Sequence, residues 1–132
     1  MIIRSTAFAF AAFASLAATG ASLAQDAEAG ARVFNQCRTC HQIGETARNG
    51  VGPQLNGLFG RKAGSIADYN YSAAYKGLDK VWSPENFTVY IKDPRGVTPG
   101  TKMVYPGLKD ETQIANLIAF LKQYAAGGKK AQ

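Results

Sequence analysis

The stretch Cys37-Arg38-Thr39-Cys40-His41 decides how the rest of the chain is interpreted, because only here do thiols and an imidazole stand close together. The pattern C-x-x-C-H is typical of a c-type haem attachment site. Two thiols at this spacing can each add to a vinyl group of one porphyrin, and the histidine that follows can place a ring nitrogen on the iron. The motif therefore predicts one covalent haem c, attached through Cys37 and Cys40, with His41 as an axial ligand.

Three other interpretations of the motif compete with haem: a redox-active dithiol, a structural disulfide and half of a zinc site. A zinc site needs about four ligands, and the sequence has no cysteine beyond Cys37 and Cys40 and no histidine beyond His41. A thioredoxin-like dithiol follows a buried strand, whereas residues 27–36 have a helical composition. The structural disulfide is retained as an alternative, because the export signal described next would deliver the chain to an oxidising compartment.

The first 24 residues have the anatomy of an export signal. Arg4 is the positive end, residues 7–18 are a short apolar run, and Ser22-Leu23-Ala24 has the small residues of a cleavage site. The run is rich in alanine and shorter than the roughly 20 residues that span a membrane. We expect cleavage after Ala24 and a single domain over residues 25–132, located in the periplasm. Loss of Arg4 lowers the formal net charge from +6 to +5.

The first and last helices of this domain are expected to pack against each other. The first covers residues 27–36, with Gly30 and Phe34 four positions apart and so on one face. The last follows Asp110 as N-cap and ends at Gly127-Gly128. Its apolar residues recur at helical spacing, namely Ile114, Leu117, Ile118 and Leu121.

Two short helices are predicted between them. Ser72 can cap a helix over residues 73–76 that ends at Gly77, and Ser83-Pro84 can begin a helix over residues 84–92 that Asp93-Pro94 stops. Three aromatic side chains should face inward from this region: Trp82, Phe87 and Tyr90.

Residues 42–71 have no sustained hydrophobic period and are dense in glycine. A loop of this length in a compact domain either marks function or argues against the assignment. A flat cofactor resolves the conflict, because the loop can bury its apolar side chains against the porphyrin. The expected haem contacts in the loop are Pro53, Leu55, Leu58 and Phe59.

Met103 is the only methionine after the initiator and lies in a loop over residues 99–107. A single methionine is more often a core residue than a ligand. In a chain with a haem attachment motif, however, the sixth position of the iron needs a ligand, and a thioether there favours reduced iron and raises the potential.

Motifs along residues 25–132 resemble those of class I cytochromes c, the family of bacterial cytochrome c2 and mitochondrial cytochrome c. They occur in the family's order and nearly its spacing, and comprise Cys37-x-x-Cys40-His41, Val51-Gly52-Pro53, Gly57-Leu58-Phe59-Gly60-Arg61-Lys62, Tyr71-Ser72, Val81-Trp82, Pro99-Gly100-Thr101-Lys102-Met103 and Leu117-Ile118-Ala119-Phe120-Leu121-Lys122. The resemblance implies an all-α cytochrome c fold. In this fold the N- and C-terminal helices cross, and short helices and long loops wrap round one haem.

The resemblance also implies roles for residues around the haem. Tyr71 and Trp82 would donate to an inner haem propionate, with Arg61 as its cationic neighbour. The carbonyl of Pro53 would accept from the free nitrogen of His41 and set the orientation of that ring.

On the other axial side, the resemblance implies that Met103 is the distal ligand and that Tyr90 and Thr101 hold it. Tyr75 departs from the family pattern, because many members have a small polar group there, beside the buried propionate. The hydrogen-bond network near Tyr75 is therefore left open.

For the helix crossing, the resemblance implies that Gly30 and Phe34 meet the last helix at Leu117 and Phe120. One residue fewer separates Phe34 from Cys37 than in mitochondrial forms. The exact partner of Gly30 is therefore left open.

These residues predict a small, soluble, monomeric electron carrier whose redox chemistry belongs to the cofactor. Its positive charge would steer acidic partners to the exposed haem edge, for transient docking on membrane proteins. The cations expected to surround this edge are Arg48, Arg95, Lys102 and Lys109. Nucleic acid is not an expected partner, since the chain has no basic helix or nucleic-acid motif.

The resemblance implies a quinol:cytochrome c oxidoreductase complex as electron donor. The acceptor would be a photosynthetic reaction centre, a terminal oxidase or a peroxidase. The main alternative is a haem enzyme or gas-binding protein whose iron has an open sixth position. Two features argue against it: the presence of Met103 and the lack of a distal histidine or arginine constellation. A thiol oxidoreductase is the second alternative.

Overall fold

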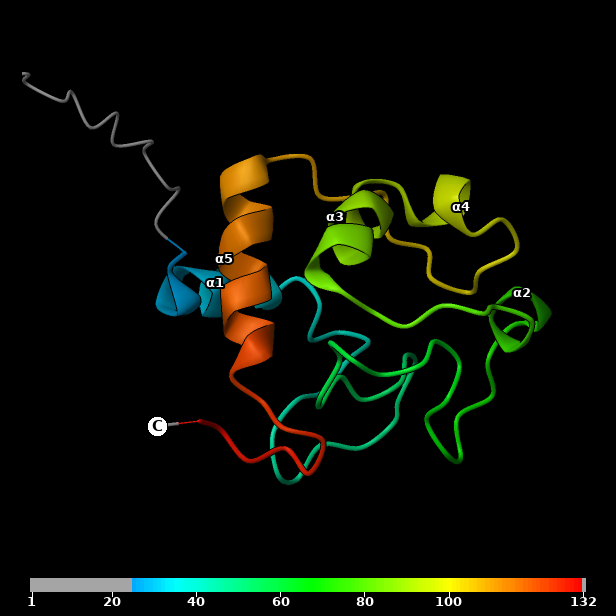
Figure 1. Cartoon of the computed structure of the whole chain (residues 1–132), viewed down its shortest axis with the longest axis horizontal. Coiled ribbons are helices and arrows are strands. Elements are labelled where there is room, and N and C mark those ends of the chain that lie inside the picture. Colours follow the sequence, from blue (N-terminus) through cyan, green and yellow to red (C-terminus); the bar gives the residue numbers. More distant parts are fainter. Residues whose placement is uncertain (1–24, 132) are drawn as a thin grey trace, which may run out of the picture.

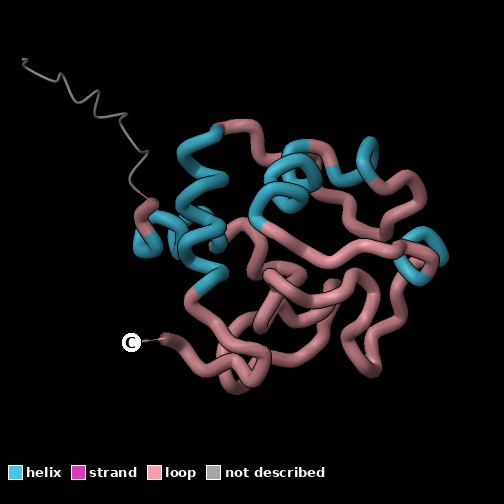
Figure 2. The backbone as a smooth tube through the Cα atoms, viewed as in Figure 1, coloured by secondary structure: helices cyan, strands magenta, loops and turns pink. Residues whose placement is uncertain are grey.

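The computed structural model describes residues 25–131, and the predicted export signal lies outside them. The described chain contains five helices, α1 to α5, joined by long loops (Figures 1 and 2), and no strand beyond two isolated bridges. The all-α prediction is thus confirmed. Within this part of the chain, no helix is long and apolar enough to cross a membrane.

The N-terminal helix α1 (Ala27–Phe34) crosses the C-terminal helix α5 (Glu111–Lys122), as Figure 1 shows. Gly30 makes the crossing possible, because a Cβ atom there would collide with the backbone carbonyl of Asn116 and lie 2.8 Å from the Cβ of Phe120. Phe34 is fully buried, and its ring centroid lies 5.1 Å from that of Phe120. The predicted crossing is confirmed, with Asn116 and Phe120 as the partners of Gly30.

A side-chain hydrogen bond also joins the two terminal helices. Asp26 caps α1 by accepting from two backbone amides of the first turn, and its own amide donates to Oδ1 of Asn116 at 3.0 Å. The same residue therefore begins α1 and fixes its position on α5. At its other end α1 is shorter than predicted, because the chain changes to tight turns at Asn35, before the haem motif.

Two of the three middle helices have the predicted bounds. Ser72 caps α2 (Ala73–Lys76), and Ser83 forms a reciprocal capping box with Asn86 at the start of α3 (Pro84–Lys92). The third, α4 (Pro94–Val97), was not predicted. Asp93-Pro94 does end α3, but the Asp93 carboxylate accepts from the Gly96 amide and begins a further turn with proline at its first position.

The predicted C-terminal boundary of the last helix is wrong. The helix α5 ends at Lys122 rather than at Gly127-Gly128, and the chain then folds back on itself and on the loop after the haem motif. The amide of Gly57 donates to the carbonyl of Tyr124 at 3.0 Å, and a bridge joins Tyr124 to Lys130. These long-range contacts, rather than a glycine cap, determine where α5 ends.

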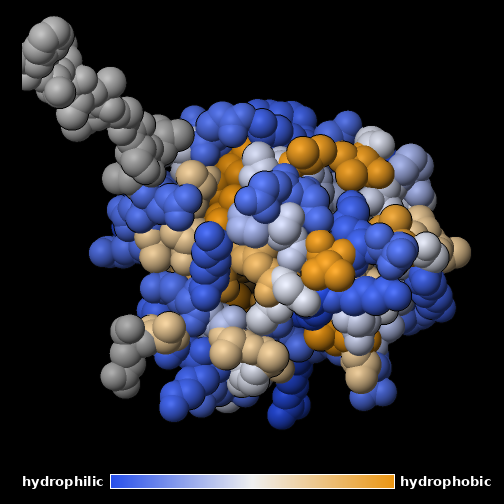
Figure 3. Space-filling view, viewed as in Figure 1, coloured by the Kyte–Doolittle hydropathy of each residue, from blue (hydrophilic) through white to orange (hydrophobic). Residues whose placement is uncertain are grey.

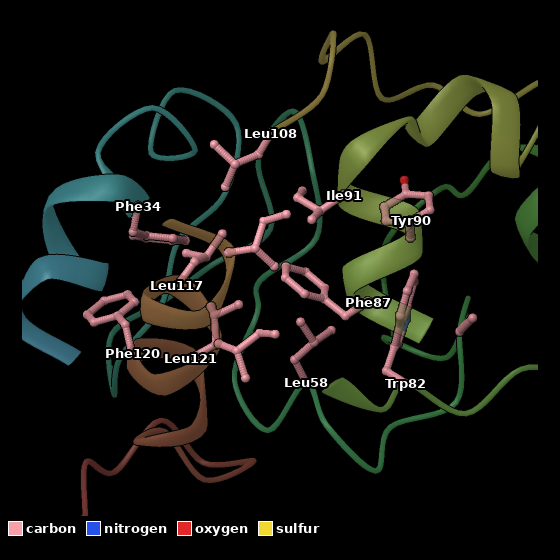
Figure 4. Close-up of a cluster of buried hydrophobic side chains, with 13 residues drawn as sticks. Phe34, Leu58, Trp82, Phe87, Tyr90, Ile91, Leu108, Leu117, Phe120 and Leu121 are labelled. Atoms are coloured by element: carbon pink, nitrogen blue, oxygen red, sulfur yellow. The ribbon is translucent and has the colours of Figure 1, made fainter. Parts of the chain in front are cut away.

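The core lies between the helices and the glycine-rich loop. Figure 4 shows Phe34, Leu58, Phe87 and Leu117 converging from α1, the loop, α3 and α5. The inward positions predicted for Trp82, Phe87 and Tyr90 are confirmed, since all three are buried. On the face shown in Figure 3, hydrophilic atoms cover most of the surface and hydrophobic atoms gather in a few patches.

The helix crossing leads to a prediction about stability. Replacing Gly30 with alanine should lower the free energy of unfolding by about 1–3 kcal/mol, the usual cost of overpacking, because the added methyl group has to displace α5. The measurement is denaturant unfolding of the haem-loaded protein. Gly127→Ala is the matched control, since no atom lies within 4 Å of a Cβ there. Equal stability of the two variants would contradict the close approach.

Candidate functional site

A cavity of about 330 Å³ opens between the haem motif, the glycine-rich loop, α3 and the loop that carries Met103. Its lining is mainly apolar. Both cysteines of the motif, His41 and Met103 line it, although more than sixty positions separate Met103 from the motif in the sequence. The structure thus brings the four predicted attachment and ligand residues to one cavity.

The backbone turns of the motif direct its three reactive side chains to this cavity. The amides of Cys40 and His41 both donate to the carbonyl of Cys37, at 3.1 and 2.9 Å, so the motif forms about one helical turn. No disulfide joins Cys37 and Cys40. Burial, with a further contribution from Cys40, raises the pKa of Cys37 to about 11. A redox-active dithiol needs a lowered thiol pKa, so this environment argues against the dithiol alternative.

The ring of His41 is fixed on one side by a backbone hydrogen bond. Its Nδ1 lies 2.8 Å from the carbonyl of Pro53 and donates to it, because a carbonyl oxygen can only accept. The proton is therefore on Nδ1, and the lone pair of Nε2 is free to bind a metal. Burial lowers the pKa of His41, against the effect of the Pro53 bond, and favours the neutral imidazole that acts as a ligand.

Gly52 shapes the pocket for this ring. A Cβ atom at Gly52 would collide with the imidazole of His41 and lie 2.7 Å from Nδ1 and 2.9 Å from Nε2. The loop backbone therefore packs directly on the ring, and a side chain at Gly52 would fill that space. The orientation of His41 thus depends on the absence of a side chain at Gly52 as well as on the carbonyl of Pro53.

Met103 is held by two polar contacts. The hydroxyl of Tyr90 donates to Sδ of Met103 at 3.3 Å, and the amide of Met103 donates to Oγ1 of Thr101 at 3.2 Å. Tyr90, Thr101 and Met103 all line the cavity. Tyr90 and Thr101 therefore lie where the resemblance implies that they hold Met103.

A second group of polar residues lines the same cavity. Nη1 of Arg61 donates to the carbonyls of Gln54 and Asn56 at 3.0 and 3.1 Å, and the Tyr71 hydroxyl accepts from the amide of Ile66 at 3.1 Å. Burial lowers the pKa of Arg61, an effect that the neighbouring Tyr71 opposes.

The chemistry of Arg61, Tyr71 and Trp82 fits the binding of a haem propionate. Within residues 25–131 the two ion pairs are formed by Arg32 with Glu28 and by Lys92 with Glu111, so no carboxylate neutralises Arg61. A half-buried cation without a counter-charge is partly desolvated, and an anion that binds beside it offsets this cost. The Tyr71 hydroxyl accepts from the amide of Ile66 and keeps its own proton available for a ligand. Trp82 also lines the cavity, with its indole N–H as a further potential donor.

The four predicted docking cations are all exposed, but only Lys102 lines the cavity. The ammonium group of Lys102 donates to the carbonyl of Asn70 at 2.6 Å, and that of Lys109 donates to the carbonyl of Lys92. Arg48 and Arg95 lie away from the cavity lining. Their docking role stays a prediction.

Two tyrosines of the lining were missed by sequence reasoning. The hydroxyl of Tyr69 donates to the carbonyl of Val51 at 2.7 Å, and that of Tyr105 donates to Oε1 of Gln36 at 2.8 Å. Each tyrosine joins loops distant in sequence, and no local pattern indicates such contacts. Among the described residues, no group of three or more His, Cys, Asp or Glu side chains is arranged to hold a metal ion.

Comparisons with known proteins agree with this geometry. The family model for Cytochrome c matches residues 27–125. The chain is 50% identical over 107 residues to cytochrome c-554 of Methylosinus trichosporium, covering 81% of each chain. It is 48% identical over 121 residues to cytochrome c2 of Blastochloris viridis, covering 92% of this chain and 95% of that one. Among solved structures, cytochrome cH from Methylobacterium extorquens is similar, with a TM-score of 0.68, 42% identity, and coverage of 74% of this chain and 97% of the other.

The packing of Gly52 on His41 leads to a second prediction. Gly52→Ala should tilt the imidazole, weaken its hydrogen bond to Pro53 and change the visible absorption spectrum of the loaded protein, with a loss of about 1–3 kcal/mol in stability. Absorption spectroscopy and thermal unfolding measure the two effects. Gly50→Ala is the control, because a Cβ there meets one atom, the carbonyl oxygen of Cys40, at an ordinary 3.7 Å. An unchanged spectrum in Gly52→Ala would contradict the proposed contact.

Proposed function

This chain belongs to the cytochrome c family, and from that premise we propose that it shuttles single electrons between membrane redox complexes in the periplasm, with His41 and Met103 as axial ligands of its iron. As a member of the family it is a haem-binding electron-transfer protein, not an enzyme, and it carries covalent haem c. When bound, the haem supplies the one-electron oxidation and reduction of its iron.

The observation that carries the proposed ligation is the presence of His41 and Met103 in one cavity, each oriented by its own hydrogen bond. The Pro53 carbonyl fixes the tautomer of His41 and leaves Nε2 as the ligand atom. The Tyr90 hydroxyl and the Thr101 side chain hold Met103. A neutral thioether favours ferrous over ferric iron, so Met103 would raise the potential.

We assign three further residues of the lining to the haem carboxylates. Arg61 provides a half-buried positive charge, and Tyr71 and Trp82 provide hydrogen-bond donors. These groups would orient the cofactor and stabilise the negative charge of its carboxylates. Cys37 and Cys40 hold the porphyrin covalently.

The proposed location and partners follow from other features. The export-signal pattern of residues 1–24 supports delivery to the periplasm. We propose a quinol:cytochrome c oxidoreductase complex as donor and a photosynthetic reaction centre, terminal oxidase or peroxidase as acceptor. Cytochrome c2 of Blastochloris viridis and the c-550 of Bradyrhizobium diazoefficiens, which is 51% identical over 106 residues, are relatives of this chain.

Replacement of Met103 tests the ligation. Wild-type ferric protein should show the weak near-infrared band of sulfur-to-iron charge transfer, and its ferrous form should bind carbon monoxide poorly at neutral pH. Met103→Ala should abolish the band, lower the potential and open the iron to small ligands, because the sixth position loses its sulfur. Val104→Ala, an exposed neighbour, is the control. Rapid and full uptake of carbon monoxide by the wild type would show that Met103 is not a ligand.

A salt titration tests electrostatic docking at the cavity mouth. Exposed charges are screened beyond about 8 Å at physiological ionic strength, so the rate of association with membranes that contain the donor complex should fall steeply as salt is added. Lys102→Glu should lower this rate and leave the potential nearly unchanged. Lys122→Glu changes the net charge equally at the end of α5, outside the cavity lining, and should have a smaller effect. An association rate that depends neither on salt concentration nor on the position of the reversed charge would rule out electrostatic steering.

A further inference from the structure

The glycine-rich loop contains two Asn-Gly pairs, Asn49-Gly50 and Asn56-Gly57, to which the proposed function gives no role. An asparagine followed by glycine is the pair most prone to spontaneous deamidation, because no side chain hinders the attack of the glycine nitrogen on the asparagine amide. The same loop brings Gly52 and Pro53 to the ring of His41. A chemical change in either pair would therefore occur in the loop that orients this ring.

The deamidation of such a pair needs only water. The glycine amide nitrogen loses its proton and bonds to Cγ of the asparagine, and the side-chain amide nitrogen leaves as ammonia. Water then opens the resulting succinimide at either of its carbonyls. The product is an aspartate, or an isoaspartate whose backbone runs through the side chain. A neutral group that can donate a hydrogen bond thus becomes a negative charge that cannot.

The side chain of Asn49 joins two loops in the folded protein. Its Nδ2 donates to the carbonyl of Ala67 at 3.1 Å, and its Oδ1 accepts from the amide of Gln54 at 3.0 Å. The attacking nitrogen is also engaged, since the amide of Gly50 donates to the carbonyl of Gly52 at 2.9 Å. Both reacting groups are held by hydrogen bonds, so Asn49 can react only when this part of the loop opens.

The opening that exposes Asn49 is a local one. Asn49 is half-buried, and Gly50 is exposed. The Tyr69 hydroxyl ties the same two loops together by donating to the carbonyl of Val51 at 2.7 Å. Beside Tyr69, Asp68 has a φ of 60°, a left-handed conformation that is uncommon outside glycine. Loss of the bonds between the loops would let this conformation relax, which favours the open state.

The second pair is protected in a different way. Asn56 is 6% exposed, and its side chain donates to the carbonyl of Gly44 at 2.9 Å and accepts from the Gly44 amide at 2.8 Å. The amide of Gly57 donates to the carbonyl of Tyr124 at 3.0 Å. The C-terminal segment also packs on this side chain, since a Cβ atom at Gly128 would lie 2.7 Å from Nδ2 of Asn56. Reaction here requires that segment to detach, which is a larger opening with a higher free energy.

The product of deamidation at Asn49 cannot restore the closed loop. A carboxylate accepts hydrogen bonds and donates none, so an oxygen would face the carbonyl of Ala67 to which Nδ2 now donates. The same loop holds Gly52, whose amide donates to the carbonyl of Cys40 at 2.8 Å and whose backbone packs on the ring of His41. Deamidation would therefore loosen the contact that orients His41.

We propose that Asn49-Gly50 is a deamidation site protected by the closed loop, and that it reacts before Asn56-Gly57 because it needs only a local opening. The hydrogen bonds that Asn49 and Tyr69 form between the two loops control this opening. The reaction adds a negative charge and leaves the loop beside His41 partly open. Because the ammonia is lost, the change is irreversible and accumulates with the age of the protein.

Mass spectrometry of the haem-loaded protein, incubated at neutral pH for several weeks and then digested, tests the site. A peptide of residues 45–60 gives the unprotected rate of both pairs. We expect Asn49 in the folded protein to react about a hundredfold more slowly than in the peptide, the combined size of three net hydrogen bonds. Asn56 should react more slowly still.

Two substitutions test the control of the opening. Tyr69→Phe keeps the ring and removes one bond between the loops, so Asn49 should react about two- to tenfold faster, while the rate at Asn56 should not change. Gly50→Ala in that background should suppress the reaction, because the methyl group hinders the attack. The methyl group fits the fold, since a Cβ at Gly50 meets one atom, at 3.7 Å.

Asn49→Asp reproduces the aspartate product. Hydrogen exchange of the Gly52 amide in this variant should be about five- to tenfold faster than in wild type, the effect of one lost hydrogen-bond partner. Exchange at the wild-type rate would overturn the loosening of the loop. The proposed site is overturned if Asn49 in the folded protein reacts as fast as in the peptide, no faster than Asn56, or at the same rate in wild type and Tyr69→Phe.

Discussion

A long loop without helices or strands can bury apolar side chains only if something fills the space beside it. In this chain Leu55 and Leu58 of the glycine-rich loop and Tyr90 and Leu117 of the helices face one cavity of about 330 Å³. The covalent haem of the family therefore takes the place of a second layer of protein. The apolar residues of the loop that line this cavity would then pack against the cofactor as well as against the protein core, so the haem would be a core element as well as a redox centre.

The crossing of the terminal helices α1 and α5 determines where the haem motif lies relative to the cavity. The contact of Gly30 with Asn116 and Phe120 brings α1 close to α5, and Phe34 packs on Phe120 from one side while it lines the cavity from the other. The haem motif begins three residues after Phe34. An error in the crossing would therefore move the motif, which explains why a helix with a destabilising interior glycine stands directly before the attachment site.

Local signals made part of this structure predictable. The cap and proline at Ser83-Pro84 and the cap at Asp110 act over a few residues, and the helix starts predicted from them are confirmed. The motif at Cys37 is equally local, and its residues line the cavity. The end of α5 and the hydroxyl partners of Tyr69 and Tyr105 depend on contacts between distant segments, and no local pattern indicates them. The hydrogen bond from His41 to the carbonyl of Pro53 was predicted from the family resemblance, because the spacing of the residues alone does not select that carbonyl.

The two proposed axial ligands are supported by chemically different partners, and this difference bears on how the potential is tuned. His41 bonds to a backbone carbonyl, which every residue possesses, so substitutions change that bond only by moving the loop. Met103 bonds to the side chain of Tyr90, whose ring in turn packs edge to face against that of Tyr75. Single substitutions can add or remove donors there without disturbing the backbone. On this argument, relatives with the same haem motif should differ in potential mainly through the residues on the methionine side.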